Sequence, residues 1–228
     1  MKTATATNAL LRAFAGFLLA NWCPVQAQSG VAAGAAVWQQ LGFNAQHSGR
    51  SPFVGPPTAS VALKWSFLTG AGVSSTPAIT PNGTLVFGSQ DHNVYALDAS
   101  GNLMWSAATG NLVYSSPALG TNNVVYVSSN DHFVYAFNAS TGATVWAFNA
   151  GGGMSSSVLL GPDGTVYAST DSAMIWAING TTGTEVWGFA TQGYNTATPV
   201  IGLDGTVFVG SSDDNVVRGS SCALTVSA

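Results

Sequence analysis

The nine residues NASTGATVW, at 138–146, decide the fold because the same phrase returns along the chain. NGTTGTEVW stands at 179–187, and the shorter form DASGNLMW stands at 98–105. Successive tryptophans, the first lying upstream of these phrases, are 40, 41 and 41 residues apart: Trp65, Trp105, Trp146 and Trp187. A period near 40 residues indicates either a propeller of β-sheets or an array of helices.

The residues within each period favour strands. Short runs such as VVYVSS (124–129) and TVFVGS (206–211) alternate in polarity and are rich in Val, Thr, Phe and Tyr. They follow turn sequences such as PDG and LDG, which is typical of tightly connected antiparallel strands. Helix formers at helical spacing are missing, and Lys and Glu are nearly absent. With four such runs per period, the chain is predicted to be an all-β propeller of four-stranded antiparallel blades.

The pattern accounts for about four blades. The last period keeps three strands and then loses both the turn and the tryptophan. In contrast, VALKWSF (61–67) is a tryptophan-type strand with no other strands of its blade before it. This strand could complete the last blade and close a ring, which would protect the sheet edges. We favour an open arc or partial propeller over a closed four-bladed ring, because units built for a wider ring lack the angle for closure.

This repeat resembles the PQQ-like β-propeller family, whose docking motif runs A-x-D-x-x-T-G-x-x-x-W, and it is similar in style to the propeller lipoproteins of outer-membrane assembly. The resemblance covers residues 38–217. It implies that the tryptophan packs over the glycine turn of its own hairpin and against the adjacent blade. The matching positions are Ala96, Asp98, Gly101 and Trp105; Ala136, Asn138, Thr141, Gly142 and Trp146; and Ala177, Asn179, Thr182, Gly183 and Trp187.

The N-terminus has the composition of a secretory signal peptide. Lys2 and Arg12 accompany a short apolar stretch at 13–22, and VQA at 25–27 offers small residues for cleavage. We therefore expect a secreted or periplasmic protein. The predicted organisation is a signal peptide at 1–27, a lead-in segment at 28–60, PQQ-like repeats at 61–218 and an irregular tail at 219–228.

Composition argues against several classes of protein. Charged residues make up 6% of the chain and the net charge is −4, so no basic cluster is available for a nucleic-acid backbone. No apolar run is long enough to cross a bilayer. Quinone enzymes of the similar family are expected to carry adjacent cysteines and a set of calcium ligands, whereas this chain has two separate cysteines and one glutamate. We predict no catalytic residue, no cofactor and no metal.

Other polar residues are interpreted as turn formers. His92 and His132 occupy equivalent turn positions in neighbouring repeats. One aspartate per repeat spreads carboxylates around the arc, whereas calcium needs about six to eight oxygens at one point; these residues are Asp91, Asp131, Asp171 and Asp213. Tyr114 and Tyr194 precede the first strand of a repeat, near a rim or channel mouth, and are the candidates for ligand contact.

These observations predict a non-enzymatic binding or scaffold protein that presents loops and strand edges to a protein partner. Two assemblies remain open, a homodimer and a propeller whose missing blades come from another chain. Two other functions also remain open. One is a carbohydrate- or surface-binding adhesin module, and the other is a fragment of a quinoprotein dehydrogenase.

Overall fold

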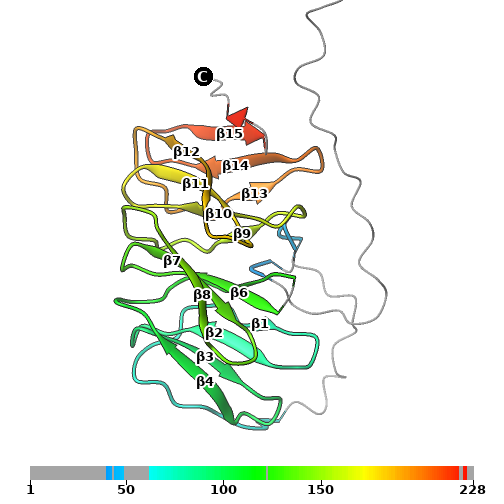
Figure 1. The fold of residues 1–228 in the computed structure, drawn as a ribbon. Helices are drawn as coiled ribbons and strands as arrows, with labels where there is room; N and C mark the ends of the chain where they lie inside the picture. The colour runs from blue at the N-terminus through cyan, green and yellow to red at the C-terminus, as the bar shows by residue number, and fades with distance from the viewer. Residues whose placement is uncertain (1–39, 43, 49–61, 122, 221–222, 225–228) are drawn as a thin grey trace, which may run out of the picture.

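The computed structural model describes residues 40–42, 44–48, 62–121, 123–220 and 223–224 (Figure 1). The predicted signal peptide, 1–27, lies outside this part of the chain, as does most of the predicted lead-in. Within the described residues there is no helix long and apolar enough to span a bilayer.

The described strands form four antiparallel sheets, each made of four strands that follow one another in the chain. The first sheet contains β1 (Ala78–Ile79), β2 (Leu85–Gly88), β3 (Asn93–Leu97) and β4 (Leu103–Ala108). The second contains β5 (Ala118–Leu119), β6 (Val124–Ser128), β7 (Phe133–Asn138) and β8 (Thr144–Asn149). The third contains β9 (Leu159–Leu160), β10 (Thr165–Ser169), β11 (Met174–Asn179) and β12 (Glu185–Ala190). The fourth contains β13 (Val200–Ile201), β14 (Thr206–Gly210), β15 (Val216–Ser220) and β16 (Ala223–Leu224).

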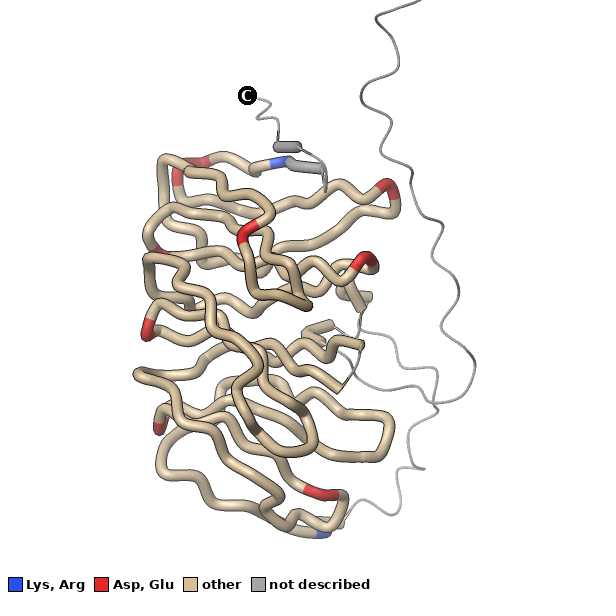
Figure 2. Tube along the Cα trace, viewed as in Figure 1, with Lys and Arg blue, Asp and Glu red and all other residues tan. Residues whose placement is uncertain are grey.

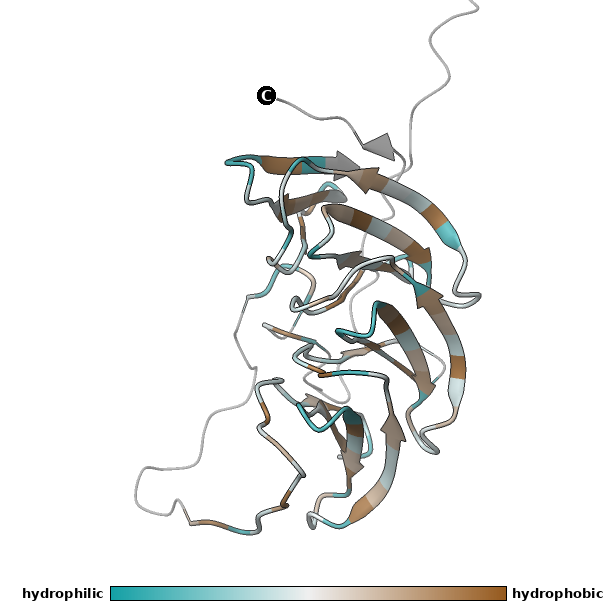
Figure 3. Cartoon of the chain, turned by 90° about the vertical axis from the view of Figure 1, so that its left-hand side faces the viewer, coloured by the Kyte–Doolittle hydropathy of each residue, from teal (hydrophilic) through white to brown (hydrophobic). Residues whose placement is uncertain are grey.

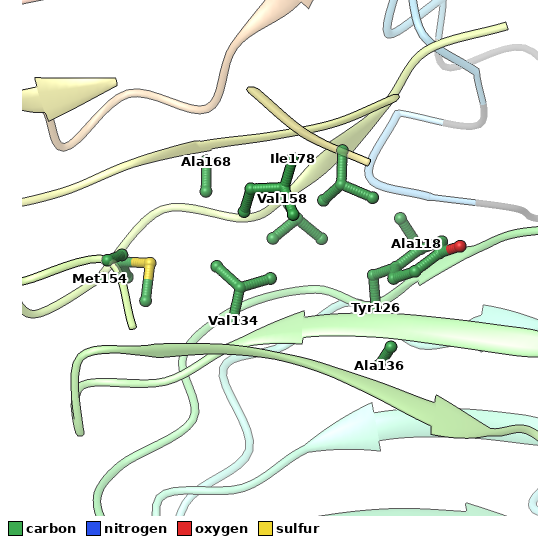
Figure 4. Close-up of a cluster of buried hydrophobic side chains, with 10 residues drawn as sticks. Ala118, Tyr126, Val134, Ala136, Met154, Val158, Ala168 and Ile178 are labelled. Carbon is green, nitrogen blue, oxygen red and sulfur yellow. The ribbon is translucent and has the colours of Figure 1, made fainter. Parts of the chain in front are cut away.

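The sheets stack face to face in chain order, and the core lies between them. Figures 1 and 3 place the first and fourth sheets at opposite ends of a curved stack. One buried cluster fills each of the three layers between consecutive sheets. In the middle layer, Val134 and Tyr126 of the second sheet point toward Val158 and Ile178 of the third (Figure 4). The prediction of an all-β partial propeller in an open arc is therefore confirmed.

Polar side chains shape the tight turns between strands. Asp163 Oδ1 accepts a hydrogen bond from the backbone N–H of Thr165 at 3.0 Å, and Asp204 Oδ1 accepts one from Thr206 at 3.0 Å. An aspartate side chain that bonds the backbone two residues on stabilises such a turn. Figure 2 shows that the strands are almost free of charge and that acidic residues lie mainly in the turns. Lys64 and Arg218 are the basic residues of the described part, one near each end of the stack.

The C-terminal boundary of the repeats differs from the prediction. β15 extends to Ser220 and pairs with β16, with Gly219 opposite Leu224. The tail predicted to be irregular from 219 onward therefore contributes to two strands of the fourth sheet. This local hairpin occupies the edge of β15 that the strand at 61–67 was considered able to complete.

Part of the predicted lead-in packs against the inner strands of the last two sheets. Gln40 Oε1 accepts a hydrogen bond from the backbone N–H of Leu160 at 3.0 Å. The carbonyl of Ala45 accepts one from Ile201 at 3.2 Å, and the Ala45 side chain joins the core between the third and fourth sheets. These contacts satisfy backbone donors at the edges of β9 and β13, which would otherwise be open to pairing with another chain.

Candidate functional site

The tryptophans fasten each sheet to the next one. Trp105, in β4 of the first sheet, donates its indole N–H to the carbonyl of Ala139 in the second sheet at 2.9 Å. Trp146, in the second sheet, donates to the carbonyl of Gly180 in the third at 2.9 Å. The expectation that each indole packs over its own hairpin is therefore wrong. The indole covers the hairpin of the following sheet because the two sheets lie face to face.

The glycines of the motif make room for these indoles. Gly142 has a φ of 72°, and a Cβ added there would lie 2.7 Å from Cε3 of Trp105. Gly183 has a φ of 71°, and a Cβ there would lie 2.6 Å from Cγ of Trp146. Two independent constraints thus select glycine, namely a left-handed backbone and direct contact with an indole.

The acidic or amide residue of the motif builds the turn that receives the indole. Asn138 Oδ1 accepts hydrogen bonds from the backbone N–H groups of Ser140 and Thr141 at 3.0 and 3.1 Å. Asn179 makes the same two bonds, at 3.0 Å each, to Thr181 and Thr182. In the shorter first turn, the Asp98 carboxylate accepts hydrogen bonds from the side-chain amide and the backbone N–H of Asn102. These bonds lower the pKa of the Asp98 carboxyl.

The alanine of the motif lies directly opposite the tryptophan on the neighbouring strand. Ala96 pairs with Trp105, Ala136 with Trp146, and Ala177 with Trp187. All three alanines have no exposed surface. Side chains at opposed positions of an antiparallel pair lie on the same face, about 5 Å apart, so a large residue there would compete with the indole for space.

Trp187 differs from the other tryptophans. Its Nε1 is buried and has no hydrogen-bond partner within the described part of the chain. The acceptors of Trp105 and Trp146 lie 34 residues further along the chain. The corresponding position for Trp187 is residue 221, which lies outside the described residues.

A second set of contacts between sheets was not predicted. The backbone N–H of Thr76 donates to Ser116 Oγ at 2.8 Å, that of Ser116 to Ser157 Oγ at 2.9 Å, and that of Ser157 to Thr198 Oγ1 at 3.1 Å. The four residues lie 40, 41 and 41 positions apart. In three of the four repeats the next residue is a proline, which defines a proline slot: Pro77, Pro117 and Pro199. A hydroxyl at this position in every repeat was the signal that could have revealed the contact.

The repeated aspartates also connect neighbouring repeats. Asp91 Oδ2 accepts hydrogen bonds from the backbone of Gly70 at 2.7 Å and from the Tyr95 hydroxyl at 2.8 Å. Asp131 makes the same pair of bonds in the second repeat, and burial together with the bond to Asp131 raises the pKa of Tyr135. In the third repeat Ser172 takes this position and bonds the carbonyl of Gly151 at 3.4 Å. Asp171, which the repeat places in the same slot with a drift of one residue, therefore does not make the contact of the other aspartates.

The two histidines are turn residues, as predicted. His92 and His132 have φ values of 71° and 79°, and their side chains are exposed. The backbone carbonyls of His92 and His132 accept hydrogen bonds from the backbone N–H groups of Thr109 and Ala150. The contact shared by the two repeats is therefore made by the backbone and not by the imidazole.

The two tyrosines singled out as ligand contacts are not brought together. Tyr194 is 66% exposed and lines an open cleft of about 350 Å³ between the third and fourth sheets, with Gln192 and Asp213. Tyr114 is half-buried and belongs to the connection between the first and second sheets. Only Tyr194 therefore keeps the geometry of a rim residue.

The first sheet is covered by an extended segment that pairs with none of the described strands. We call residues 62–69 the leading segment. Trp65 docks as the later tryptophans do, through an indole bond to the Ala99 carbonyl at 3.1 Å, and Phe67 meets the ring of Tyr95 edge-on at 5.6 Å. Along residues 63–68, exposed and half-buried positions alternate in the same order as in β8 and β12. Yet no strand of the described chain pairs with the leading segment.

Comparison with known proteins decides the family. The family model described as outer membrane protein assembly factor BamB matches residues 27–159 and 130–222. The chain belongs to this family. No curated protein matches the chain significantly.

Solved structures share the fold. BamB from Moraxella catarrhalis is 19% identical with a TM-score of 0.61, and the match covers 70% of this chain and 53% of that one. Quinohemoprotein alcohol dehydrogenase from Comamonas testosteroni is 18% identical with a TM-score of 0.74, covering 86% and 41%. Quinohemoprotein alcohol dehydrogenase ADHIIG from Pseudomonas putida HK5 is 16% identical with a TM-score of 0.71, covering 85% and 40%. The chain thus spans about half or less of the length of these structures.

The described residues offer no gathered ligand set for the metal ion of a bound quinone. Within the described ranges, no three His, Cys, Asp or Glu side chains gather where they could hold a metal. The one glutamate, Glu185, begins β12 and is exposed. The two cysteines, Cys23 and Cys222, lie outside the described residues and far apart in sequence.

Proposed function

We propose that this BamB-family protein is an exported, non-enzymatic scaffold that binds another polypeptide through the open end of its sheet stack and its loops. The observation that carries the proposal is the leading segment. It is held in extended form by Trp65 and Phe67, and none of the described strands lies beside it. A strand edge of this kind offers a row of backbone donors and acceptors to an extended peptide.

The family supports the same role. Its description names an assembly factor of outer membrane proteins, which is a task of binding polypeptides. We extend this to the present chain as a protein of the periplasm. The composition of residues 1–27 supports export. N-terminal sequencing of the exported protein tests this step, and a mature chain that begins at Gln28 is the expected result.

Crosslinking in the organism that makes the protein tests the binding role. One variant carries a photoreactive residue at Ser66, in the leading segment. A second variant carries it at Val145 of β8, a residue that is 51% exposed on the outer strand of the second sheet. We expect a discrete polypeptide to be captured from position 66 and not from position 145. A third variant carries the photoreactive residue at Tyr194, which is 66% exposed. If neither position 66 nor position 194 captures a polypeptide, the scaffold role is wrong.

An enzymatic role has a direct test. The purified chain is mixed with pyrroloquinoline quinone and calcium, and dye reduction with alcohols is followed. We expect no activity, because the residues of the described chain lack a gathered donor set. Turnover that requires the quinone would contradict a non-enzymatic function.

A carbohydrate-binding role is favoured by one observation, the 66% exposed ring of Tyr194 in the cleft beside Gln192 and Asp213. An exposed aromatic face with nearby polar groups suits a sugar ring. A glycan array with the native chain and Tyr194→Ala separates this role from polypeptide binding. Selective glycan binding that Tyr194→Ala removes would favour it.

A further inference from the structure

In the first three sheets, the outermost strand (β4, β8 or β12) carries the tryptophan of the motif. The leading segment occupies the corresponding position in front of the first sheet. In those sheets the outermost strand, which carries the tryptophan, pairs with a third strand whose sequence repeats. The position opposite the tryptophan is always alanine, and the position two residues before it is Val94, Val134 or Ile175. These positions are at most 1% exposed. The protein therefore contains three copies of the strand that fits beside a docked tryptophan.

We propose that the leading segment pairs with an antiparallel strand of a partner polypeptide. The partner strand carries valine or isoleucine, then any residue, then alanine, and this alanine lies opposite Trp65. This inference rests on the scaffold role proposed above and names the chemistry of its partner. The small residue is needed because the indole of Trp65, docked over Gly101, occupies the same face. The branched residue would enter the layer in front of the first sheet.

That layer is the incomplete one. The three layers between consecutive sheets each hold a cluster of buried residues, whereas among the described residues no such cluster lies in front of the first sheet. Ile79, on β1, is 39% exposed there. Burial of further apolar surface at this end would therefore favour binding, against the cost of ordering the partner.

A second copy of this chain is a poor occupant. The strand that a second copy would offer is β15, in which Arg218 takes the position of the alanine. Arg218 lies opposite Phe208, as Ala136 lies opposite Tyr126 in the second sheet. A guanidinium at that point would lie against the indole and lose its water. The pattern thus selects a partner whose strand carries a small residue there.

The test uses the full chain and a labelled synthetic peptide with the sequence of residues 131–139, DHFVYAFNA, which includes β7. The control peptide carries the change Ala136→Arg. We expect saturable binding of the first peptide by fluorescence anisotropy, at least tenfold weaker binding of the second, and slowed amide hydrogen exchange in residues 62–69. A peptide that binds without protecting this segment, or equal binding of the two peptides, would overturn the inference.

Two further outcomes separate this inference from the scaffold role. If the peptide fails to bind while a polypeptide is still crosslinked from position 194, the scaffold role stands and the strand acceptor is wrong. If sedimentation shows a concentration-dependent dimer, and hydrogen exchange shows that dimerisation protects residues 62–69, the occupant is a second copy and the proposed partner is wrong.

Discussion

Trp105 and Ala139 lie 34 residues apart in the chain, yet the indole N–H of the first donates to the carbonyl of the second at 2.9 Å, so one sheet is tied to the hairpin of the next. The contact has a direction, because the donor always belongs to the earlier sheet. Stacked repeats that touch only their neighbours gain stability from each such interface. Disrupting one contact should therefore weaken the joint between two particular sheets.

The glycine under the indole can be tested by replacement. Gly142→Ala places a methyl group 2.7 Å from Trp105 at a φ of 72°, and we expect a loss of about 2–4 kcal/mol in the free energy of unfolding. Gly151→Ala is the matched control, because its φ is 74° but nothing lies within 4 Å of the added carbon. It should cost about 1 kcal/mol. Equal losses in urea unfolding would contradict a role for indole contact.

Removing the indole donors should affect two interfaces unequally. Trp105→Phe leaves the Ala139 carbonyl without its bond, and we expect a cost of about 2–4 kcal/mol, with part of it from the smaller ring. Trp146→Phe should cost less, because the Gly180 carbonyl also accepts the Tyr126 hydroxyl at 3.0 Å. Denaturant midpoints of the two variants give the comparison. A larger loss for Trp146→Phe would show that the hydrogen bond is not the deciding term.

The hydroxyl contacts near the proline slot predict a further loss. Ser157→Ala removes the acceptor of the buried Ser116 N–H, which lies 2.9 Å from Ser157 Oγ. An unsatisfied buried donor costs about 1–3 kcal/mol. Ser155→Ala is the control, because its exposed hydroxyl loses only a solvent-accessible bond to Asp171 Oδ2 at 3.2 Å, and it should cost clearly less than Ser157→Ala. Unfolding by urea measures both, and a neutral Ser157→Ala would mean that water replaces the hydroxyl.

The pH dependence of stability should reveal one buried phenol. Burial, followed by the nearby Asp163, raises the pKa of Tyr167 to about 12. Since the pKa of an unfolded tyrosine is about 10, the neutral phenol stabilises the fold fully below pH 10, and this is lost as the pH rises toward 12. By pH 11 the expected loss is about 1 kcal/mol. Between pH 9 and 11, the free energy of unfolding of Tyr167→Phe should fall by about 1 kcal/mol less than that of the native protein. An identical pH profile for the two proteins would contradict the raised pKa of Tyr167.

Much of the fold follows from local features of the sequence. Turn sequences such as PDG at 162–164, followed by the alternating run 165–170, place the hairpins because strands and tight turns are decided by residues close in sequence. The motif correctly paired Ala136 with Trp146, which lie opposite each other on neighbouring strands, whereas Gly142 receives the indole of Trp105 instead. In contrast, the aspartate equivalence failed in the third repeat, because a shift of one residue puts Ser172 in the place of Asp131 without disturbing the pattern.

The repeating four-stranded unit and its turns were readable from the amino acids, since they depend on alternation and on turn chemistry within about forty residues. The direction in which the tryptophans dock was not. Trp105 lies 4 residues after Gly101 and 37 before Gly142, and a periodic pattern treats both turns alike. Only the packing of one sheet against the next selects Gly142, because the indole points out of its own sheet. The same packing holds the leading segment extended over the first sheet, where no strand of the described residues pairs with it.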